Sequence, residues 1–384
     1  MVWSPAMDGP LEAVFGLGVL GAAAAIGALA ANAIRIPPAV GALASGIAVA
    51  RLLPISLHPE SVWPVQAFAC AWLCLILGME LDLRAIGRAA SRSSLAAGLA
   101  HAASVFVLGA AAAWGAGLPP ATAGVAGLCL LAGSPLATIA VTATSSARGA
   151  LTRRLHSMSA VTFAAALAAA ALAGGKVWWQ PWAGLTLGCV CGAVLLIPLS
   201  RTVTRGGHHL VAALGCLLIV LVSTWLGGGM AWVALLSLGA GLVVGHLTDA
   251  GDARLAMRDV SLPAVLFWFA LSGARLDPAT LIAGALGGVL MTGARAGAAF
   301  LWFKGSRGGP DSWLRPMAAL PTSAGIVAAA VAGSADGDLM MAILLVATAM
   351  TEVLGMAAAR TVLAAAREAV PLSDEPDAWR ASMR

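Results

Sequence analysis

The amino-acid sequence predicts an all-α polytopic membrane protein of about 13 transmembrane helices, arranged as two inverted repeats with broken helices. Three observations predict this: the composition, the alternation of basic residues between loops, and two helix-breaking motifs at matched positions. The chain of 384 residues is 60% hydrophobic and only 10% charged, whereas a soluble domain carries about 25% charged residues. So few polar side chains cannot cover a water-facing surface, which excludes a disordered protein, a disulfide scaffold and an ordinary soluble enzyme.

Breaking the chain at charged, Pro-rich and Gly-rich joints gives apolar segments close to the length of about 20 residues that a membrane span needs. The thirteen segments are 11–31, 37–50, 62–81, 93–114, 119–144, 153–173, 181–200, 208–226, 229–247, 258–274, 279–303, 314–333 and 339–360. We therefore expect one transmembrane domain over residues 1–361 and a short cytoplasmic tail over 362–384.

The loops between these segments alternate in charge. One side holds 18 Lys and Arg residues, whereas the other holds only Arg51, Lys176 and Arg275. Because basic loops stay on the cytoplasmic side, this pattern predicts a multi-pass protein of the inner membrane with its N-terminus outside and its C-terminus in the cytoplasm. The same topology explains the basic pI of about 9.2, so we expect no nucleic-acid partner.

Two phrases recur at an offset of 195 residues. Residues 78–82 and 273–277 end two segments with Gly-Met-Glu-Leu-Asp and Gly-Ala-Arg-Leu-Asp, and residues 44–49 match 239–244. The matched segments run in opposite directions through the membrane. We therefore predict inverted repeats over about 11–173 and 208–360, joined by a linker helix at 181–200, as in many secondary transporters that work by alternating access.

The fifth segment of each predicted repeat contains a helix-breaking motif. Residues 131–138 read Leu-Ala-Gly-Ser-Pro-Leu-Ala-Thr, and residues 320–325 read Leu-Pro-Thr-Ser-Ala-Gly. Proline removes a backbone donor and glycine adds freedom, so each helix is expected to open there. Freed backbone groups at this depth need polar partners, and the neighbouring hydroxyls are those of Ser134, Thr138, Thr322 and Ser323. The alternative for each segment is an ordinary proline kink.

These sequence motifs, in this order along the chain, resemble those of the monovalent cation:proton antiporter superfamily, which has the sodium/hydrogen exchanger fold. The phrases that carry the resemblance are residues 77–84, Gly133-Ser134-Pro135, residues 147–154 and residues 262–277. The resemblance implies a sodium/proton antiporter fold, cation and proton substrates, and a homodimer.

One departure from this pattern concerns the ion site. The resemblance implies an acidic pair on the sixth helix, but the matching stretch here has Thr162 and Phe163 in that place. No carboxylate lies in segment 153–173, and Ser159 and Thr162 are the polar candidates there. A hydroxyl cannot alternate between proton and cation at physiological pH, so the acidic site of the family does not carry over.

Two ionisable residues lie deep in the predicted spans, Arg295 and Glu352. Intramembrane charges are costly and are therefore functional candidates. Each lies about 12 Å from the cytoplasmic end of its helix, at about 1.5 Å per residue, so an ion pair is possible. One interpretation makes Glu352 the proton- or cation-binding carboxyl with Arg295 as a competing cation; the other is a structural pair. His101 lies near a membrane end or within segment 93–114, and His156 lies at the inner start of segment 153–173. Both are interpreted as polar helix-end residues, with a proton relay as the alternative.

The sequence thus predicts a secondary transporter that exchanges Na⁺ or K⁺ for protons across the bilayer. No catalytic, cofactor or metal site is expected, and the protein is not predicted to be an enzyme. Two alternatives stay open. The same fold would carry an anion or a small polar organic solute, or the chain is a non-transporting scaffold or sensor.

Overall fold

The computed structural model describes most of the chain at the level of helices and contacts. The described residues are 10–34, 36–52, 59–80, 92–134, 179–202, 204–247, 251–303, 321–322, 337–366 and the positions 138, 141, 147, 152, 155, 159, 162, 163, 165, 166 and 169. Every named element among them is a helix, and one isolated antiparallel bridge joins Gly133 to Thr322. The prediction of an all-α protein is confirmed.

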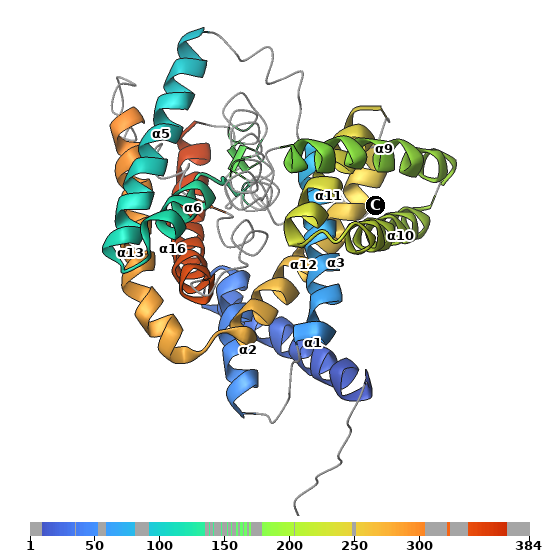
Figure 1. Ribbon diagram of the computed structural model, residues 1–384, viewed down its shortest axis with the longest axis horizontal. Helices are drawn as coiled ribbons and strands as arrows, with labels where there is room; N and C mark the ends of the chain where they lie inside the picture. The colour runs from blue at the N-terminus through green and yellow to red at the C-terminus, as the bar shows by residue number, and fades with distance from the viewer. Residues whose placement is uncertain are drawn as a thin grey trace, which may run out of the picture. The chain divides into compact units, whose positions relative to one another are not determined.

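Eleven helices carry labels in Figure 1. They are α1 (Pro10–Ala33), α2 (Pro38–Leu52), α3 (Pro59–Glu80), α5 (Arg92–Gly115), α6 (Pro120–Leu130), α9 (Gln180–Arg201), α10 (Arg205–Trp225), α11 (Met230–Leu247), α12 (Gly251–Arg275), α13 (Pro278–Phe303) and α16 (Gly337–Ala365). Each overlaps one predicted segment, although α6 covers only the first part of segment 119–144 and α12 begins before segment 258–274. The sixth and twelfth segments fall largely outside the described residues, so the count of thirteen stays a prediction. Six of these helices are long and apolar enough to cross a membrane: α1, α3, α9, α10, α13 and α16.

The helix starts follow from local chemistry. Helices α2, α3, α6 and α13 each begin at a proline, which fits the first helical position because its missing N–H has no intrahelical acceptor there. Helix α10 has the side chain of Thr204 as its N-cap, and the hydroxyl accepts a hydrogen bond of 3.1 Å from the Gly207 amide. Such caps satisfy amide donors that the helix itself leaves open.

The chain divides into two compact units, each assembled from two chain segments. Unit 1 comprises Met1–Met79 and Trp179–Leu281, and unit 2 comprises Glu80–Trp178 and Ile282–Arg384. Unit 1 therefore takes α1–α3 from one predicted repeat and α10–α12 from the other, together with the predicted linker helix α9. Unit 2 likewise draws on both halves. The packing units thus cut across the predicted repeats.

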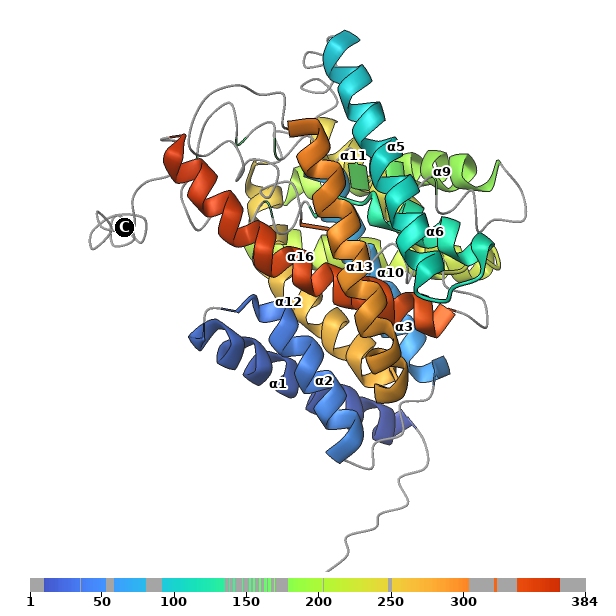
Figure 2. The same cartoon turned by 90° about the vertical axis from the view of Figure 1, so that its left-hand side faces the viewer.

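Unit 1 is held together by close helix contacts at glycines. Helices α1 and α2 lie side by side in both views (Figures 1 and 2), and a Cβ on Gly41 would lie 2.0 Å from the Gly27 carbonyl oxygen. Small residues let membrane helices approach this closely.

Two further pairs of contacts in unit 1 are reciprocal. A Cβ on Gly46 would lie 2.0 Å from the carbonyl oxygen of Ala270, and one on Gly241 would lie 2.0 Å from that of Leu75. Subtracting 195 from 241 and 270 gives 46 and 75. The contact of Gly241 with Leu75 is therefore the repeat-related equivalent of the contact of Gly46 with Ala270. Gly78 against Leu238 and Gly273 against Leu43 form a second such set.

Adding a methyl group at one of these contacts is expected to destabilise unit 1. In Gly241→Ala the new Cβ meets the α3 backbone at 2.0 Å, so the helices must separate, at a cost of about 1–3 kcal/mol. Thermal unfolding of the purified protein in detergent measures this effect. Gly18→Ala on α1 is the matched control, because nothing lies within 4 Å of its Cβ, and alanine is the better helix former. Equal melting temperatures for the two variants would refute the tight α3–α11 contact.

Among the described residues, an ion pair joins Arg51 and Asp277 in unit 1. Arg51, at the end of α2, donates to Asp277 at 2.6 Å, and both side chains are more than half exposed. Arg275 at the end of α12 donates to Gln66 on α3 at 2.8 Å. The loop pattern predicts Arg51 and Arg275 on the same side of the membrane, and their partners here are polar residues of the same unit.

In unit 2, α5 packs against α6 and α13 packs against α16 (Figure 2). A Cβ on Gly127 of α6 would lie 2.8 Å from the Phe106 carbonyl oxygen of α5, and one on Gly284 of α13 would lie 2.8 Å from the Ala342 side chain of α16. A Cβ on Gly355 of α16 would lie 2.3 Å from the ring of Pro321. These contacts bring α16 directly against the second predicted helix break.

Candidate functional site

The two predicted helix breaks meet inside unit 2. Helix α6 ends at Leu130, and the non-helical residues after it pair with residues 321–322. Gly133 forms the antiparallel bridge with Thr322, and the Ser134 amide donates to the Pro321 carbonyl at 3.0 Å. The Thr322 hydroxyl donates to the Ala132 carbonyl. Backbone groups that leave a helix at bilayer depth need such partners, and here each break satisfies the other.

Arg295 on α13 joins both breaks. Its side chain is 5% exposed, and its guanidinium donates to the Leu130 carbonyl at the end of α6 and, at 3.2 Å, to the Pro321 carbonyl. The last carbonyls of a helix lack intrahelical donors and carry partial negative charge. The planar guanidinium, with its several donors, can therefore serve two backbone acceptors at once.

Glu352 on α16 meets the first break through a hydroxyl. The Ser134 hydroxyl donates to Glu352 Oε1 at 3.5 Å, a long hydrogen bond between residues that are 1% and 9% exposed. The Ser134 carbonyl also accepts from the amide and the hydroxyl of Thr138, each at 3.0 Å. A carboxyl group, a hydroxyl and backbone carbonyls thus gather where α6 is interrupted.

Ser159 and Thr162, from the stretch where the resemblance implies an acidic pair, pack directly on this break. The Gly133 amide donates to the Thr162 hydroxyl at 3.1 Å, and that hydroxyl lies 3.2 Å from the Ser159 carbonyl. A Cβ on Gly133 would lie 2.6 Å from the Thr162 hydroxyl oxygen and 2.7 Å from the Ser159 Cα, so only glycine fits here. Phe163 is 1% exposed and contributes volume rather than polarity. Thr162 therefore bonds the crossover backbone where the resemblance implied a carboxylate.

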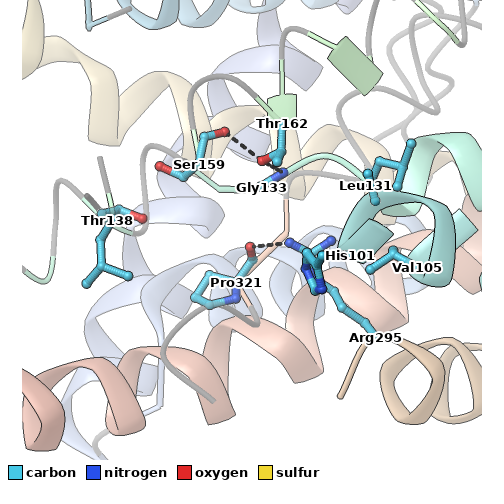
Figure 3. A pocket seen from close by; sticks show the side chains of 11 residues that line it. His101, Val105, Leu131, Gly133, Thr138, Ser159, Thr162, Arg295 and Pro321 are labelled. Atoms are coloured by element: carbon cyan, nitrogen blue, oxygen red, sulfur yellow. Dashed lines mark hydrogen bonds between the residues drawn. The ribbon is translucent and has the colours of Figure 1, made fainter. Parts of the chain in front are cut away.

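A cavity of about 40 Å³ lies beside the crossover. Its polar lining includes Arg295, His101 of α5, and the residues Thr138, Ser159 and Thr162 (Figure 3). Figure 3 shows the imidazole of His101 next to the guanidinium of Arg295, with the Pro321 carbonyl in hydrogen-bond contact with the latter. His101 Nδ1 is buried and has no hydrogen-bond partner.

Seven of the eight candidate residues from the sequence lie among the described residues, and the structure brings them together around the crossover. They are Ser134, Thr138, Ser159, Thr162, Arg295, Thr322 and Glu352. Ser323 lies outside the described residues. Arg295 and Glu352 have different partners here, because the guanidinium bonds backbone carbonyls and the carboxyl bonds Ser134. The ion pair considered from their equal depth is therefore replaced by two separate interactions in this structure.

The sequence leaves His101 either near a membrane end or within segment 93–114, and the structure places it in the cavity that Arg295 also lines. A signal in the sequence points to this position. Subtracting 101 from 295 gives 194, one residue short of the repeat offset of 195. The two basic residues thus occupy nearly equivalent places in the predicted repeats.

Removing one hydroxyl at the crossover is expected to weaken unit 2. Thr322→Val keeps the side-chain shape but leaves the buried Ala132 carbonyl without its donor, which costs about 1–3 kcal/mol. Thermal unfolding in detergent measures the loss. Thr361→Val on α16 is the matched control, because its hydroxyl bonds Ala357 at an exposed position. An unchanged melting temperature for Thr322→Val would show that this hydroxyl does not hold the crossover.

The architecture has a solved counterpart. The sodium proton antiporter MjNhaP1 from Methanocaldococcus jannaschii superposes with a TM-score of 0.69 at 16% sequence identity, over 92% of this chain and 98% of that one. The chain has the fold of a sodium/proton antiporter. No family model matches the sequence, and no curated protein sequence matches it significantly.

Proposed function

We propose that this protein is a secondary transporter that exchanges a monovalent cation, Na⁺ or K⁺, for protons by alternating access. The observation that carries the proposal is the buried carboxyl of Glu352 at the crossover of two interrupted segments, hydrogen-bonded by Ser134. The fold it shares with a sodium proton antiporter supports the same proposal.

Glu352 is assigned the role of the group that binds proton and cation in turn. Exchange needs a titratable group, which neither Thr162 nor Phe163 supplies. Among the acidic side chains that the structure describes, Asp277 and Asp338 are exposed, whereas Glu352 is buried. Unwound backbone carbonyls and half-helix ends at the bilayer midplane are the usual ligands of transported Na⁺ and H⁺, and the crossover next to Glu352 offers such carbonyls.

The reciprocal glycine contacts support the alternating-access part of the proposal. Gly46 contacts Ala270, and Gly241 contacts Leu75 at the equivalent positions of the repeats. The two predicted repeats thus pack on each other by equivalent surfaces. Inverted copies with equivalent packing supply two related conformations that open to opposite sides. The homodimer, the outside N-terminus and the inner-membrane location are kept from the sequence as part of the proposal.

The cavity volume bears on the alternative solutes. Sites for small organic molecules usually measure about 300–1,000 Å³, whereas the cavity at the crossover measures about 40 Å³. A single inorganic ion fits this volume better than an organic solute. The cavity volume therefore argues against an organic solute at this point, whereas the case for a cation rests on Glu352, which does not line the cavity.

Reconstitution tests the proposal. Purified protein in proteoliposomes with a pH-sensitive dye inside is expected to move protons when Na⁺, K⁺ or Li⁺ is added outside, with the preferred ion giving the fastest response. A wild-type protein that is folded, correctly inserted and silent towards all three cations would overturn the proposal and favour a scaffold or sensor.

A further inference from the structure

The ring of His101 lies against the face of α13 that carries Arg295. The imidazole donates a hydrogen bond to the Ala298 carbonyl. Ala298 follows Arg295 by three residues, so the two positions share one face of the helix. His101 and Arg295 also line the same cavity and interact electrostatically, and Figure 3 shows the imidazole next to the guanidinium.

The other ring nitrogen of His101 is a buried acceptor without a donor. Nδ1 has no hydrogen-bond partner and is shielded from water, so the nitrogen that donates to Ala298 is Nε2. A neutral imidazole donates from one nitrogen and accepts at the other, and a second positive charge beside the guanidinium is unfavourable. Nδ1 therefore carries a lone pair, and leaving this buried acceptor unsatisfied costs free energy.

Arg295 uses other acceptors in this conformation. Its guanidinium donates to the Leu130 and Pro321 carbonyls, one from each interrupted segment. A guanidinium holds several donors in one rigid plane. A rearrangement of either segment therefore changes which acceptors it meets, and His101 Nδ1 is an acceptor beside it that this conformation leaves unused.

We propose that His101 is a positioning residue for Arg295, whose guanidinium donates to Nδ1 in the second conformation of the transport cycle. The inference rests on the proposed exchange by alternating access. One hydrogen bond to a backbone carbonyl breaks and one to the imidazole forms, with no proton transferred. The acceptor that is unsatisfied here is satisfied there, which offsets the lost carbonyl contact. His101 thus brings the two conformations closer in free energy.

Two substitutions of His101 test this role in proteoliposomes. His101→Phe keeps a ring but has no donor or acceptor, whereas the amide of His101→Gln has both. The exchange rate of His101→Phe is expected to fall about tenfold, because one hydrogen bond to a charged group is lost in one conformation only. His101→Gln is expected to recover most of the rate. His209→Phe on α10 of unit 1 is the matched control and is expected to exchange like the wild type.

Nitrogen-15 NMR of the full-length protein in detergent, with labelled histidine, reads the ring without a transport assay. The His101 signals are those missing from the spectrum of His101→Gln. The Nδ1 shift separates a bare lone pair, a hydrogen-bonded lone pair and a protonated nitrogen. A bare and a hydrogen-bonded signal are both expected, and adding Na⁺, K⁺ or Li⁺ in turn is expected to change their proportions as the conformations shift.

Failure of this inference and failure of the proposed function give different results. In a wild type that exchanges cations, an Nδ1 signal that is always bare or is protonated would overturn the role of His101 alone. Wild-type exchange by His101→Phe, or no recovery in His101→Gln, would do the same. Bare and hydrogen-bonded signals in a wild type that exchanges no cation would defeat the proposed function and support the contact between Arg295 and His101. An always bare signal in such a protein would overturn both.

Discussion

Glu352→Gln is expected to abolish cation-driven proton movement in proteoliposomes while leaving the protein folded. The amide has the shape of the carboxyl but no titratable proton, so it cannot alternate between proton and cation. The buried position loses no charge partner of its own, because the contact that the structure shows is with the Ser134 hydroxyl. Burying a neutral amide in place of a carboxylate is also less costly. The measurement is the fluorescence of an internal pH dye after a cation pulse.

The same helix offers a matched control. Asp338 lies in the first turn of α16 and is exposed, so Asp338→Asn makes the same chemical change away from the crossover. This variant is expected to exchange cations like the wild type. If Glu352→Gln exchanged at the wild-type rate, the carrier would have to be another group, and the residues outside the described part of the chain would be searched first.

Arg295→Gln is expected to give the largest loss of stability among single substitutions in unit 2. It removes the donors to two buried carbonyls, those of Leu130 and Pro321, at about 1–3 kcal/mol for each group left unsatisfied. The two breaks then lose their common partner, so the crossover relaxes and exchange falls with it. Thermal unfolding in detergent and the proteoliposome assay measure the two effects.

Two further variants separate charge from geometry at this position. Arg295→Lys keeps the charge but places its donors on one nitrogen, so it cannot span both carbonyls, and an intermediate stability is expected. Arg51→Gln is the control for removing an arginine, since its ion pair with Asp277 is exposed and such pairs contribute about 0–1 kcal/mol. An Arg295→Gln protein with the same unfolding temperature as the wild type would show that other groups satisfy the Leu130 and Pro321 carbonyls.

The helices and the two helix interruptions could be predicted from the sequence because each depends on a short local stretch of residues. Apolar length predicted the spans, and the glycine and proline of residues 133–135 predicted an interruption just after α6, which ends at Leu130. The motif at residues 320–325 predicted a second interruption, and in the structure Pro321 and Thr322 form hydrogen bonds with the residues of the first. Periodicity and helix-breaking residues are properties of short windows, so they survive without tertiary information.

The partners of the buried charges did not follow from the sequence. Arg295 bonds backbone carbonyls, and a carbonyl has no residue type that a sequence pattern can reveal. Equal depth made Glu352 a plausible partner, but depth says nothing about which face of each helix a residue occupies. His101 is the single ionisable residue of segment 93–114; the repeat offset hints at its equivalence to Arg295, but the packing of α5 against the crossover is what places the two side chains on one cavity. The division into two units was equally non-local, because it depends on which helices pack together.

Cation-induced proton release tests the central claim most directly, since it asks whether one buried carboxyl exchanges a proton for a cation. Purified protein in weakly buffered detergent solution receives the preferred cation while a pH electrode or dye follows the solution. The wild type and Asp338→Asn are expected to acidify the solution by about one proton for each cation bound, whereas Glu352→Gln releases none. Proton release from Glu352→Gln equal to that of the wild type would contradict the assignment of Glu352 as the carrier.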